Sequence, residues 1–140
     1  MIILASDHAG YELKQYLKLF LSKNNIEFTD VGALTYDAQD DYPDLAKNGV
    51  SLMFQDDNNK GIFICGSGVG MSMVANRYKG IRAVLALDVK TAQMARLHND
   101  ANVLCLGQRR ISKHKAIKIV LKFLTTKFEG GKHKRRIDKF

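Results

Sequence analysis

Short apolar runs alternate with longer amphipathic stretches along the whole chain. The apolar runs predict β-strands at residues 2–6, 26–31, 62–65, 82–87 and 103–106. The stretches between them predict helices at residues 11–23, 43–54, 71–76, 91–98 and 112–126. In the first helix, Leu13, Leu17 and Leu21 recur on one face. Repeated strand–helix units favour a five-stranded parallel sheet with helices on both of its faces.

The composition is that of one globular domain. With 140 residues, 46% of them hydrophobic, the chain is long enough for a single core, and we expect one domain over residues 1–140. The segment Met1–Ala5 lacks the basic start of a signal peptide, and no apolar run approaches the ~18 residues of a membrane span. We therefore expect a cytoplasmic protein whose two cysteines, Cys65 and Cys105, are free thiols.

Positive charge gathers at the C-terminal end. The net charge is +8, and residues 101–140 hold 12 Lys and Arg against 2 Asp and Glu. Such asymmetry is typical of proteins that bind nucleic acid, a membrane surface or a small anionic substrate. The lysines of the last predicted helix have the spacing of a solvated face, and aromatic residues interleaved with basic ones are sparse. We therefore expect a small anionic substrate, with neither nucleic acid nor a membrane as partner.

Polar clusters follow four of the predicted strands directly. They are Asp7–Gly10, Cys65–Gly70, Asp88 and Gly107–Arg110. Because the carboxyl ends of parallel strands share one edge of the sheet, where ligands bind in open α/β folds, these clusters predict the site. The segment His98–Asn102 instead precedes a strand and should lie at the opposite edge of its own subunit. If it belongs to the site, the site is shared between subunits.

Residues 62–70 combine a thiol with a glycine-rich turn. Cys65 ends the apolar run, and Gly66, Gly68 and Gly70 follow before the next helix. Glycines let the backbone turn sharply and leave N–H groups free for an anion, helped by the helix dipole. A thiolate here would be a base or nucleophile beside oxyanion donors. The spacing is equally typical of a phosphate-binding turn beside an inert buried cysteine.

Patterns of other chemistries are missing. The four histidines are scattered along the sequence, HExxH is absent, and neither cysteine belongs to a CxxC pair. Residues 66–70 do not fit GxGxxG, and no Walker A lysine follows them. A cysteine-protease arrangement would need a histidine oriented by Asn or Asp, which His98 and Asn99 could supply, but the glycine loop serves an enediolate equally well. We expect no metal and no cofactor.

Five segments of the chain, taken in order, match the pattern of a known enzyme family. They are Asp7-His8-Ala9-Gly10, Asp41-Tyr42-Pro43, Gly61 to Gly70, His98 to Val103, and Glu129-Gly130-Gly131-Lys132-His133. Together they resemble the ribose-5-phosphate isomerase B family over nearly the whole chain. The resemblance implies a Rossmann-like three-layer α/β/α fold and a homodimer or homotetramer with sites between subunits. It also implies metal-free interconversion of ribose 5-phosphate and ribulose 5-phosphate through an enediolate.

The resemblance also implies roles for individual residues. The implied catalytic residues are Cys65, Ser67, His98 and Asp7. The implied substrate-binding residues are His8, Tyr42, Gly66, Gly68, Val69, Gly70, Asn99, Arg109, Lys132 and Arg136. Cys65 would move the proton between C2 and C1, and His98 of the partner subunit, with Asp7, would open the furanose ring. Basic residues of the set would bind the phosphate, which gives the basic tail at 127–140 a part in the site.

Two positions depart from the family pattern. Family members often have Arg where this chain has Lys132, so one phosphate contact would be a point charge instead of a bidentate fork. A related branch uses a carboxylate as base at the position of Met71, which leaves Cys65 as the base here.

Two other functions stay open at this level. The sister galactose-6-phosphate isomerases resemble the chain too, but the intact His98-Asn99-Asp100 triplet favours the pentose phosphate. The alternatives are therefore a galactose or allose 6-phosphate isomerase, or a non-catalytic module that binds phosphate or nucleic acid.

Overall fold

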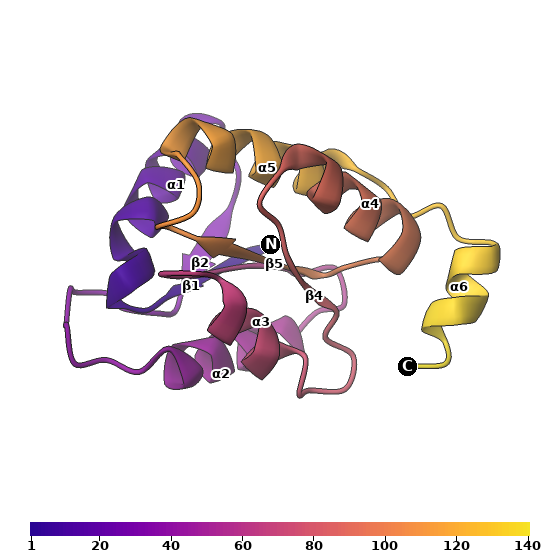
Figure 1. Ribbon diagram of the computed structural model, residues 1–140, viewed down its shortest axis with the longest axis horizontal. Coiled ribbons are helices and arrows are strands. Elements are labelled where there is room, and N and C mark those ends of the chain that lie inside the picture. Colours follow the sequence, from indigo (N-terminus) through magenta and orange to yellow (C-terminus); the bar gives the residue numbers. More distant parts are fainter.

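The computed structural model describes all 140 residues and is built around a five-stranded parallel sheet (Figure 1). Its strands are β1 (Ile2–Ser6), β2 (Phe28–Asp30), β3 (Lys60–Cys65), β4 (Ala83–Leu85) and β5 (Val103–Gly107). They lie in the order β2-β1-β3-β5-β4, and every neighbouring pair is parallel. The predicted α/β class and the five-stranded parallel sheet are confirmed.

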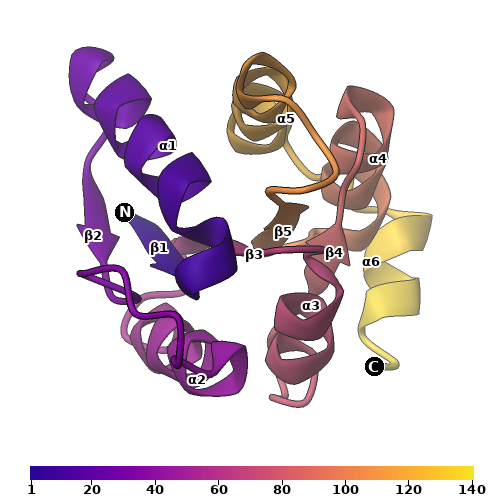
Figure 2. The same ribbon diagram turned by 60° about the vertical axis from the view of Figure 1, so that its left-hand side comes forward.

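Helices cover both faces of this sheet. They are α1 (Tyr11–Lys23), α2 (Tyr42–Met53), α3 (Val69–Ala75), α4 (Val89–Asn99), α5 (Lys113–Thr125) and α6 (Lys132–Ile137), with a 3₁₀ turn η1 (His8–Gly10). Helices α1, α4 and α5 lie on one face and α2 and α3 on the other (Figures 1 and 2). This is the three-layer arrangement expected from the sequence.

Two apolar layers follow from the alternation of side chains along the strands. In β3, Ile62 and Ile64 face the layer formed with α1, α4 and α5. The alternate residues Phe63 and Cys65 face the layer formed with α2 and α3. Because successive side chains of a strand point to opposite faces, a strand covered on both sides reads as one continuous apolar run.

The edge strands are shorter than predicted, and the last helix was not predicted. Strands β2 and β4 span three residues each because each has a neighbour on one side only. Helix α6 lies in the basic tail, where the sequence shows no apolar periodicity, and it packs against α4. Its one buried side chain is His133, so a tertiary contact and not an apolar stripe holds it in place.

One lysine is buried, against the usual preference of its side chain. Lys14 of α1 is fully buried, and its ammonium donates to Asp30 at 2.6 Å and to the carbonyl oxygens of Gly32 and Ala33. Burial lowers the pKa of this ammonium, while the Asp30 carboxylate acts against that shift. Lys14 thus ties the end of β2 and the beginning of the following segment to α1.

The strand order reverses between β1 and β3. The chain leaves β1 through α1 to reach β2 at one edge, then returns through α2, on the other face, to β3. The carboxyl ends of β1 and β3 therefore lie beside each other with their connections running in opposite directions. Open α/β sheets bind ligands in the crevice at such a point. No helix has both the length and the apolar character needed to cross a bilayer.

Candidate active site

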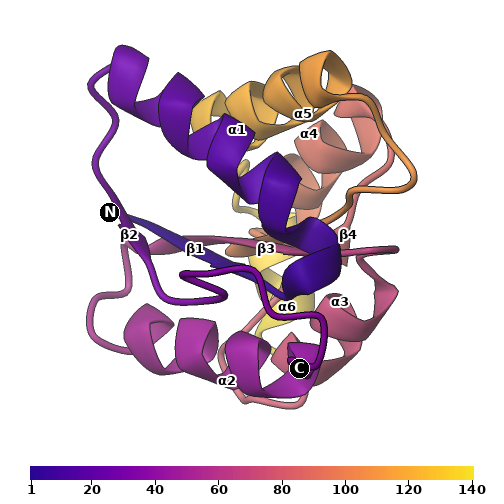
Figure 3. The same ribbon diagram turned by 90° about the vertical axis from the view of Figure 1, so that its left-hand side faces the viewer.

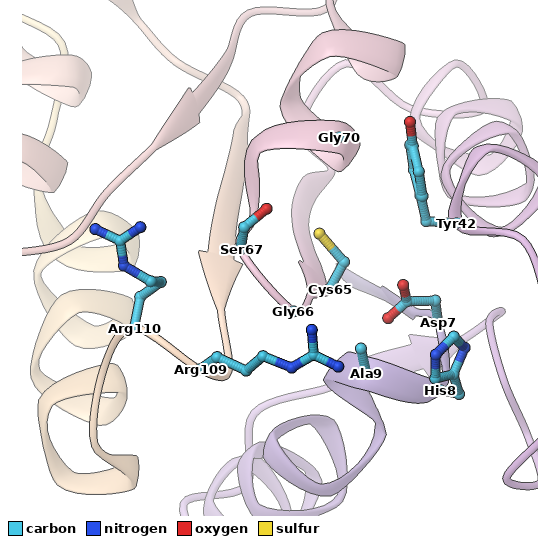
Figure 4. A pocket seen from close by; sticks show the side chains of 10 residues that line it. All are labelled: Asp7, His8, Ala9, Tyr42, Cys65, Gly66, Ser67, Gly70, Arg109 and Arg110. Atoms are coloured by element: carbon cyan, nitrogen blue, oxygen red, sulfur yellow. The ribbon is translucent and has the colours of Figure 1, made fainter. Parts of the chain in front are cut away.

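A cavity of about 340 Å³ opens at the reversal point of the sheet (Figure 4). It is lined by Asp7, His8, Ala9, Tyr42, Cys65, Gly66, Ser67, Gly70, Arg109 and Arg110. These residues come from the segments after β1, β3 and β5 and from the first turn of α2. The structure therefore brings together three of the four strand-end clusters that the sequence singles out.

Cys65 lies in the middle of the cavity wall, between Asp7 on one side and Ser67 on the other (Figure 4). It is the last residue of β3 and is 4% exposed. The backbone N–H of Gly68 donates to Cys65 Sγ at 3.1 Å. The thiol thus lines the cavity and lies beside a backbone N–H donor.

The glycine loop takes its shape from Gly68 and Ser67. Gly68 has φ +80°, a left-handed conformation that glycine adopts without steric cost. The Val69 N–H donates to Ser67 Oγ at 3.2 Å, which leaves the hydroxyl proton of Ser67 free for another acceptor. Helix α3 begins here, and the first N–H groups of a helix lack partners within it. The loop therefore presents Gly66, the Ser67 hydroxyl and Gly70 to the cavity.

Asp7 faces Cys65 across the cavity. It is 5% exposed and accepts a hydrogen bond from the Gly10 N–H at 2.9 Å. Burial raises the pKa of the Asp7 carboxyl, an effect that the Gly10 N–H opposes. Asp7 therefore holds a proton at higher pH than an ordinary aspartate, as a group that exchanges protons with a substrate requires.

His8 forms an ion pair that the sequence does not reveal. Its Nδ1 lies 2.6 Å from Asp40 Oδ1, and its backbone N–H donates to the same oxygen at 2.9 Å. The hydrogen bond with Asp40 is the main reason why the pKa of His8 is raised. His8 is thereby favoured as an imidazolium, a cation on the wall of the cavity.

Arg109 adds a second cation to the cavity. Its side chain extends past Gly66 toward Ala9 (Figure 4), and a Cβ at Gly66 would lie 3.1 Å from Arg109 Nη1. The Arg109 N–H donates to the carbonyl oxygen of Gly66 at 3.0 Å, which fixes its loop against the glycine loop. Arg110 also lines the cavity, although its side chain is more distant from Cys65 in Figure 4.

Tyr42 closes the opposite wall. It begins α2, directly before Pro43, whose fixed φ suits the first turn of a helix. The Tyr42 ring packs against Gly70, where a Cβ would come within 2.6 Å of ring carbon Cε2. The ring therefore depends on a glycine at position 70 for its place in the cavity.

The remaining predicted site residues do not line this cavity. His98 and Asn99 end α4, and Lys132 and Arg136 lie on α6, beyond the other end of the sheet. Gly68 and Val69 belong to the loop without lining the cavity, and the Val69 side chain is exposed. His98 lies away from Cys65 of its own chain. This position was expected, because His98 precedes a strand while Cys65 ends one.

His98 instead belongs to a second polar cluster. Its ring stacks on that of His133 with centroids 4.3 Å apart, and both Nε2 atoms approach Glu129 Oε2, at 3.9 Å and 3.4 Å. Burial and the neighbouring His98 lower the pKa of His133. One ring nitrogen of each histidine and a carboxylate oxygen of Glu129 lie within 4.8 Å of one another, and Lys132 on α6 adds positive charge beside His133.

Several features of the site were missed or overvalued at the level of sequence. Asp88, the fourth strand-end candidate, lies outside the cavity and caps α4 by accepting the Thr91 N–H at 2.7 Å. Ala9 and Arg110 line the cavity but were not among the predicted binding residues, although both lie in clusters that follow strands. The contact of Asp40 with His8 could not be predicted from the sequence, because the two residues are 32 positions apart.

The fold and cavity define a doubly wound α/β protein with a thiol and two cations at the switch point of its sheet. A family model described as ribose/galactose isomerase matches residues 2–140. The chain belongs to this family.

Individual relatives of known family support this assignment to the ribose/galactose isomerase family. The probable ribose-5-phosphate isomerase B of Mycoplasma pneumoniae is 47% identical over 99% of this chain and 91% of its own length. The crystal structure of a ribose 5-phosphate isomerase from Thermotoga maritima has a TM-score of 0.95 at 47% identity, covering 99% and 94%. The structure of ribose-5-phosphate isomerase B from Mycoplasma genitalium, solved with bound ribulose 5-phosphate, has a TM-score of 0.95 at 45% identity, covering 99% and 91%.

Proposed function

We propose that this protein interconverts ribose 5-phosphate and ribulose 5-phosphate through an enediolate, with Cys65 as the base. The observation that carries the proposal is the cavity itself, in which a thiol, an oxyanion-binding loop and two cationic side chains surround one small space. A relative that is 45% identical to this chain was solved with ribulose 5-phosphate bound, which supports the choice of substrate.

Cys65 performs the proton transfer in this scheme. The thiolate removes the proton from C2 of the open-chain aldose, and the electron pair of that bond moves to C1 and its carbonyl oxygen. The thiol returns the proton to C1, and the hydroxyl proton of the C2 oxygen passes to the C1 oxygen, so that C2 becomes the carbonyl carbon of the ketose. One base therefore serves both steps, and the Gly68 N–H donates to its sulfur at 3.1 Å.

The glycine loop stabilises the negative charge of the intermediate. In this scheme the Ser67 hydroxyl and the backbone N–H groups of the lining residues Gly66, Ser67 and Gly70 donate to the enediolate oxygens, while the N–H groups of Gly68 and Val69 bond to Cys65 Sγ and Ser67 Oγ. Donors that are already oriented require no reorganisation when the charge forms, which is why they lower the barrier. Tyr42 contacts a sugar hydroxyl from the opposite wall.

His8 and Arg109 bind the phosphate from one chain. Lys132 and Arg136 complete the phosphate site from α6 of a partner subunit, because in their own chain they lie away from the cavity. The same holds for His98 and Asn99. His98 of the partner subunit and Asp7 open the furanose ring by moving protons at the ring oxygen and the anomeric hydroxyl.

An apolar surface beside the glycine loop supports a homodimer. Val69 and Met73, which lie one turn apart on α3, are 45% and 67% exposed. Strand β4 at the sheet edge has a neighbour on one side only, and a hollow beside it is lined by Val84, Ala95 and Phe140. Exposed apolar side chains around a free sheet edge are typical of subunit interfaces.

A direct test compares a pentose phosphate with two hexose phosphates in excess chelator. We expect the purified protein to convert ribose 5-phosphate with a higher kcat/KM than galactose 6-phosphate or allose 6-phosphate, because the described cavity is small. The hexose phosphates are tested because the description of the family names galactose as well as ribose. Preference for a hexose phosphate would transfer the same mechanism to that substrate, and loss of all turnover with retained phosphate binding would leave a binding module.

The role of His98 makes a separate prediction. His98→Asn should lose at least about tenfold in kcat with ribose 5-phosphate, as expected when an acid–base group is removed. It should leave the rate almost unchanged with 4-deoxyribose 5-phosphate, which lacks the hydroxyl that closes the furanose ring. Equal losses on both substrates would exclude ring opening as its role.

Mixing the inactive variants Cys65→Ala and His98→Asn tests the shared site. A mixed dimer with two-fold symmetry has one site in which both residues are intact, so random exchange should restore about a quarter of the wild-type rate. If both residues served one site within a single chain, mixing would restore nothing.

A further inference from the structure

The segment between β2 and α2 runs from the end of β2 past the beginning of α1 (Figure 3), and its residue Asp40 contacts His8, which lines the cavity. Lys14 fixes its first residues through the carbonyl oxygens of Gly32 and Ala33. Asp40 fixes its last residues through two hydrogen bonds to His8. The segment is therefore tied at one end to a buried lysine and at the other to a residue of the proposed phosphate site.

The Asp40 carboxylate is arranged in an unusual way. Oδ1 accepts both the backbone N–H of His8, at 2.9 Å, and a bond from His8 Nδ1, at 2.6 Å. Oδ2 is buried and has no hydrogen-bond partner. A buried oxygen without a partner lowers stability, so a residue chosen only to anchor the segment would be a poor choice. The cost makes sense if the carboxylate serves the chemistry of His8.

The pair also determines which protons His8 carries. With Nδ1–H donating to Asp40, the second ring nitrogen Nε2 carries a proton only when the ring is an imidazolium. An anionic phosphate in the cavity would bind the imidazolium form of His8 in preference to the neutral ring. Tyr36, from the same segment, meets the His8 ring edge-on with centroids 6.2 Å apart, which restricts the ring further.

We propose that Asp40 is a positioning residue that holds the His8 ring in place and leaves Nε2–H as a donor to the phosphate of the substrate. The inference rests on the proposed function insofar as it takes His8 to bind phosphate. In this arrangement His8 contacts the phosphate. The Asp40 carboxylate acts through His8 and does not touch the substrate.

The surroundings of His8 determine the expected dependence on pH. Asp7 and Asp40 face His8 with negative charge, Tyr36 covers it, and Arg109 lines the same cavity with positive charge. The Asp40 hydrogen bond is the largest contribution that raises the pKa of His8. Removing it lets the pKa fall, so that between the lower and the higher value the ring is charged in the wild type and neutral in the variant. As the pH rises, phosphate affinity should therefore begin to weaken at a lower pH in the variant than in the wild type.

The experiment measures the Kd of inorganic phosphate by calorimetry at pH 6 and pH 8 in the wild type and in Asp40→Asn, a change that preserves shape. The loss of affinity in the variant should be larger at pH 8, up to about tenfold for one charge-assisted hydrogen bond, than at pH 6, where it should stay within about twofold. Proton NMR of the His8 ring should show its titration at lower pH in the variant. Asp37→Asn is the matched control, because Asp37 lies in the same segment and its carboxylate accepts only the N–H of Gln39.

Two outcomes overturn the inference. An equal loss of affinity at both pH values would mean that Asp40 only supports the fold of the segment, and an unchanged Kd would mean that it has no effect on phosphate. In the background of His8→Gln, Asp40→Asn should add no further pH dependence, and an added effect would contradict transmission through His8. Isomerase activity is measured separately: its absence in a wild type that shows these phosphate and NMR results defeats the proposed function and leaves the role of Asp40 intact.

Discussion

Cys65→Ala should abolish isomerisation while leaving substrate binding in place. A general base contributes about 10²–10⁴-fold to the rate, and the chain has no second base at this position, because Met71 replaces the carboxylate of the related branch and is fully buried. The phosphate contacts of His8 and Arg109 do not involve the thiol, so KM should change little. The measurement is turnover of ribose 5-phosphate in excess chelator, together with deuterium incorporation at C1 in D2O.

Cys105→Ala is the matched control. Cys105 lies in β5, is fully buried in the layer formed with α2 and α3, and does not line the cavity. Burial raises the pKa of its thiol, which keeps it protonated and unreactive. This variant should keep its kcat and its deuterium incorporation. Should Cys65→Ala retain more than about a tenth of the wild-type rate, the assignment of the base would be wrong, since removing a general base costs more than that.

The part of the site that follows β1, β3 and β5 could be predicted from the sequence because its geometry is local. Parallel strands place their carboxyl ends at one edge, so residues such as Asp7 and Cys65 meet wherever the strands are correctly located. The same rule selected Asp88, which caps a helix instead, because a strand end is also the usual place of a helix N-cap. A position at the edge is therefore necessary for this site but does not distinguish a ligand contact from a cap.

What the sequence did not reveal depends on contacts between distant positions. Asp40 and His8 are 32 residues apart in the sequence, and Lys14 and Asp30 are 16 residues apart. The local pattern of these segments does not predict either pair. Helix α6 forms in a basic stretch because His133 stacks on His98, a contact that apolar periodicity does not record. The order of the strands is likewise a property of packing, since alternation of apolar residues identifies a strand without identifying its neighbours.

Gly68→Ala should damage both stability and catalysis, because the loop that holds the thiol depends on this glycine. At φ +80° an added Cβ is strained, and it would lie 2.5 Å from Leu85 Cδ1 and 2.9 Å from the backbone carbon of Leu106. The Leu85 side chain can move, but Leu106 is paired with Ile64 in the centre of the sheet. The loop must therefore shift, and the Gly68 N–H leaves Cys65 Sγ. Strain and overpacking together should cost about 2–5 kcal/mol in the free energy of unfolding.

Gly80→Ala separates the strain of the backbone from the displacement of the loop. Gly80 also has a left-handed φ, +91°, but the nearest atom to its added Cβ is Phe54 Cε1 at 3.7 Å, an ordinary contact. It should lose about 1–2 kcal/mol of stability, the cost of the backbone conformation alone, and keep its kcat. Gly68→Ala should in addition lose more than about tenfold in kcat at a temperature where it is folded, since an oriented donor to a reacting group is worth that much. Urea unfolding gives the stabilities, and if the two variants shared the same kcat, the hydrogen bond from Gly68 to the thiol would have no part in making Cys65 a base.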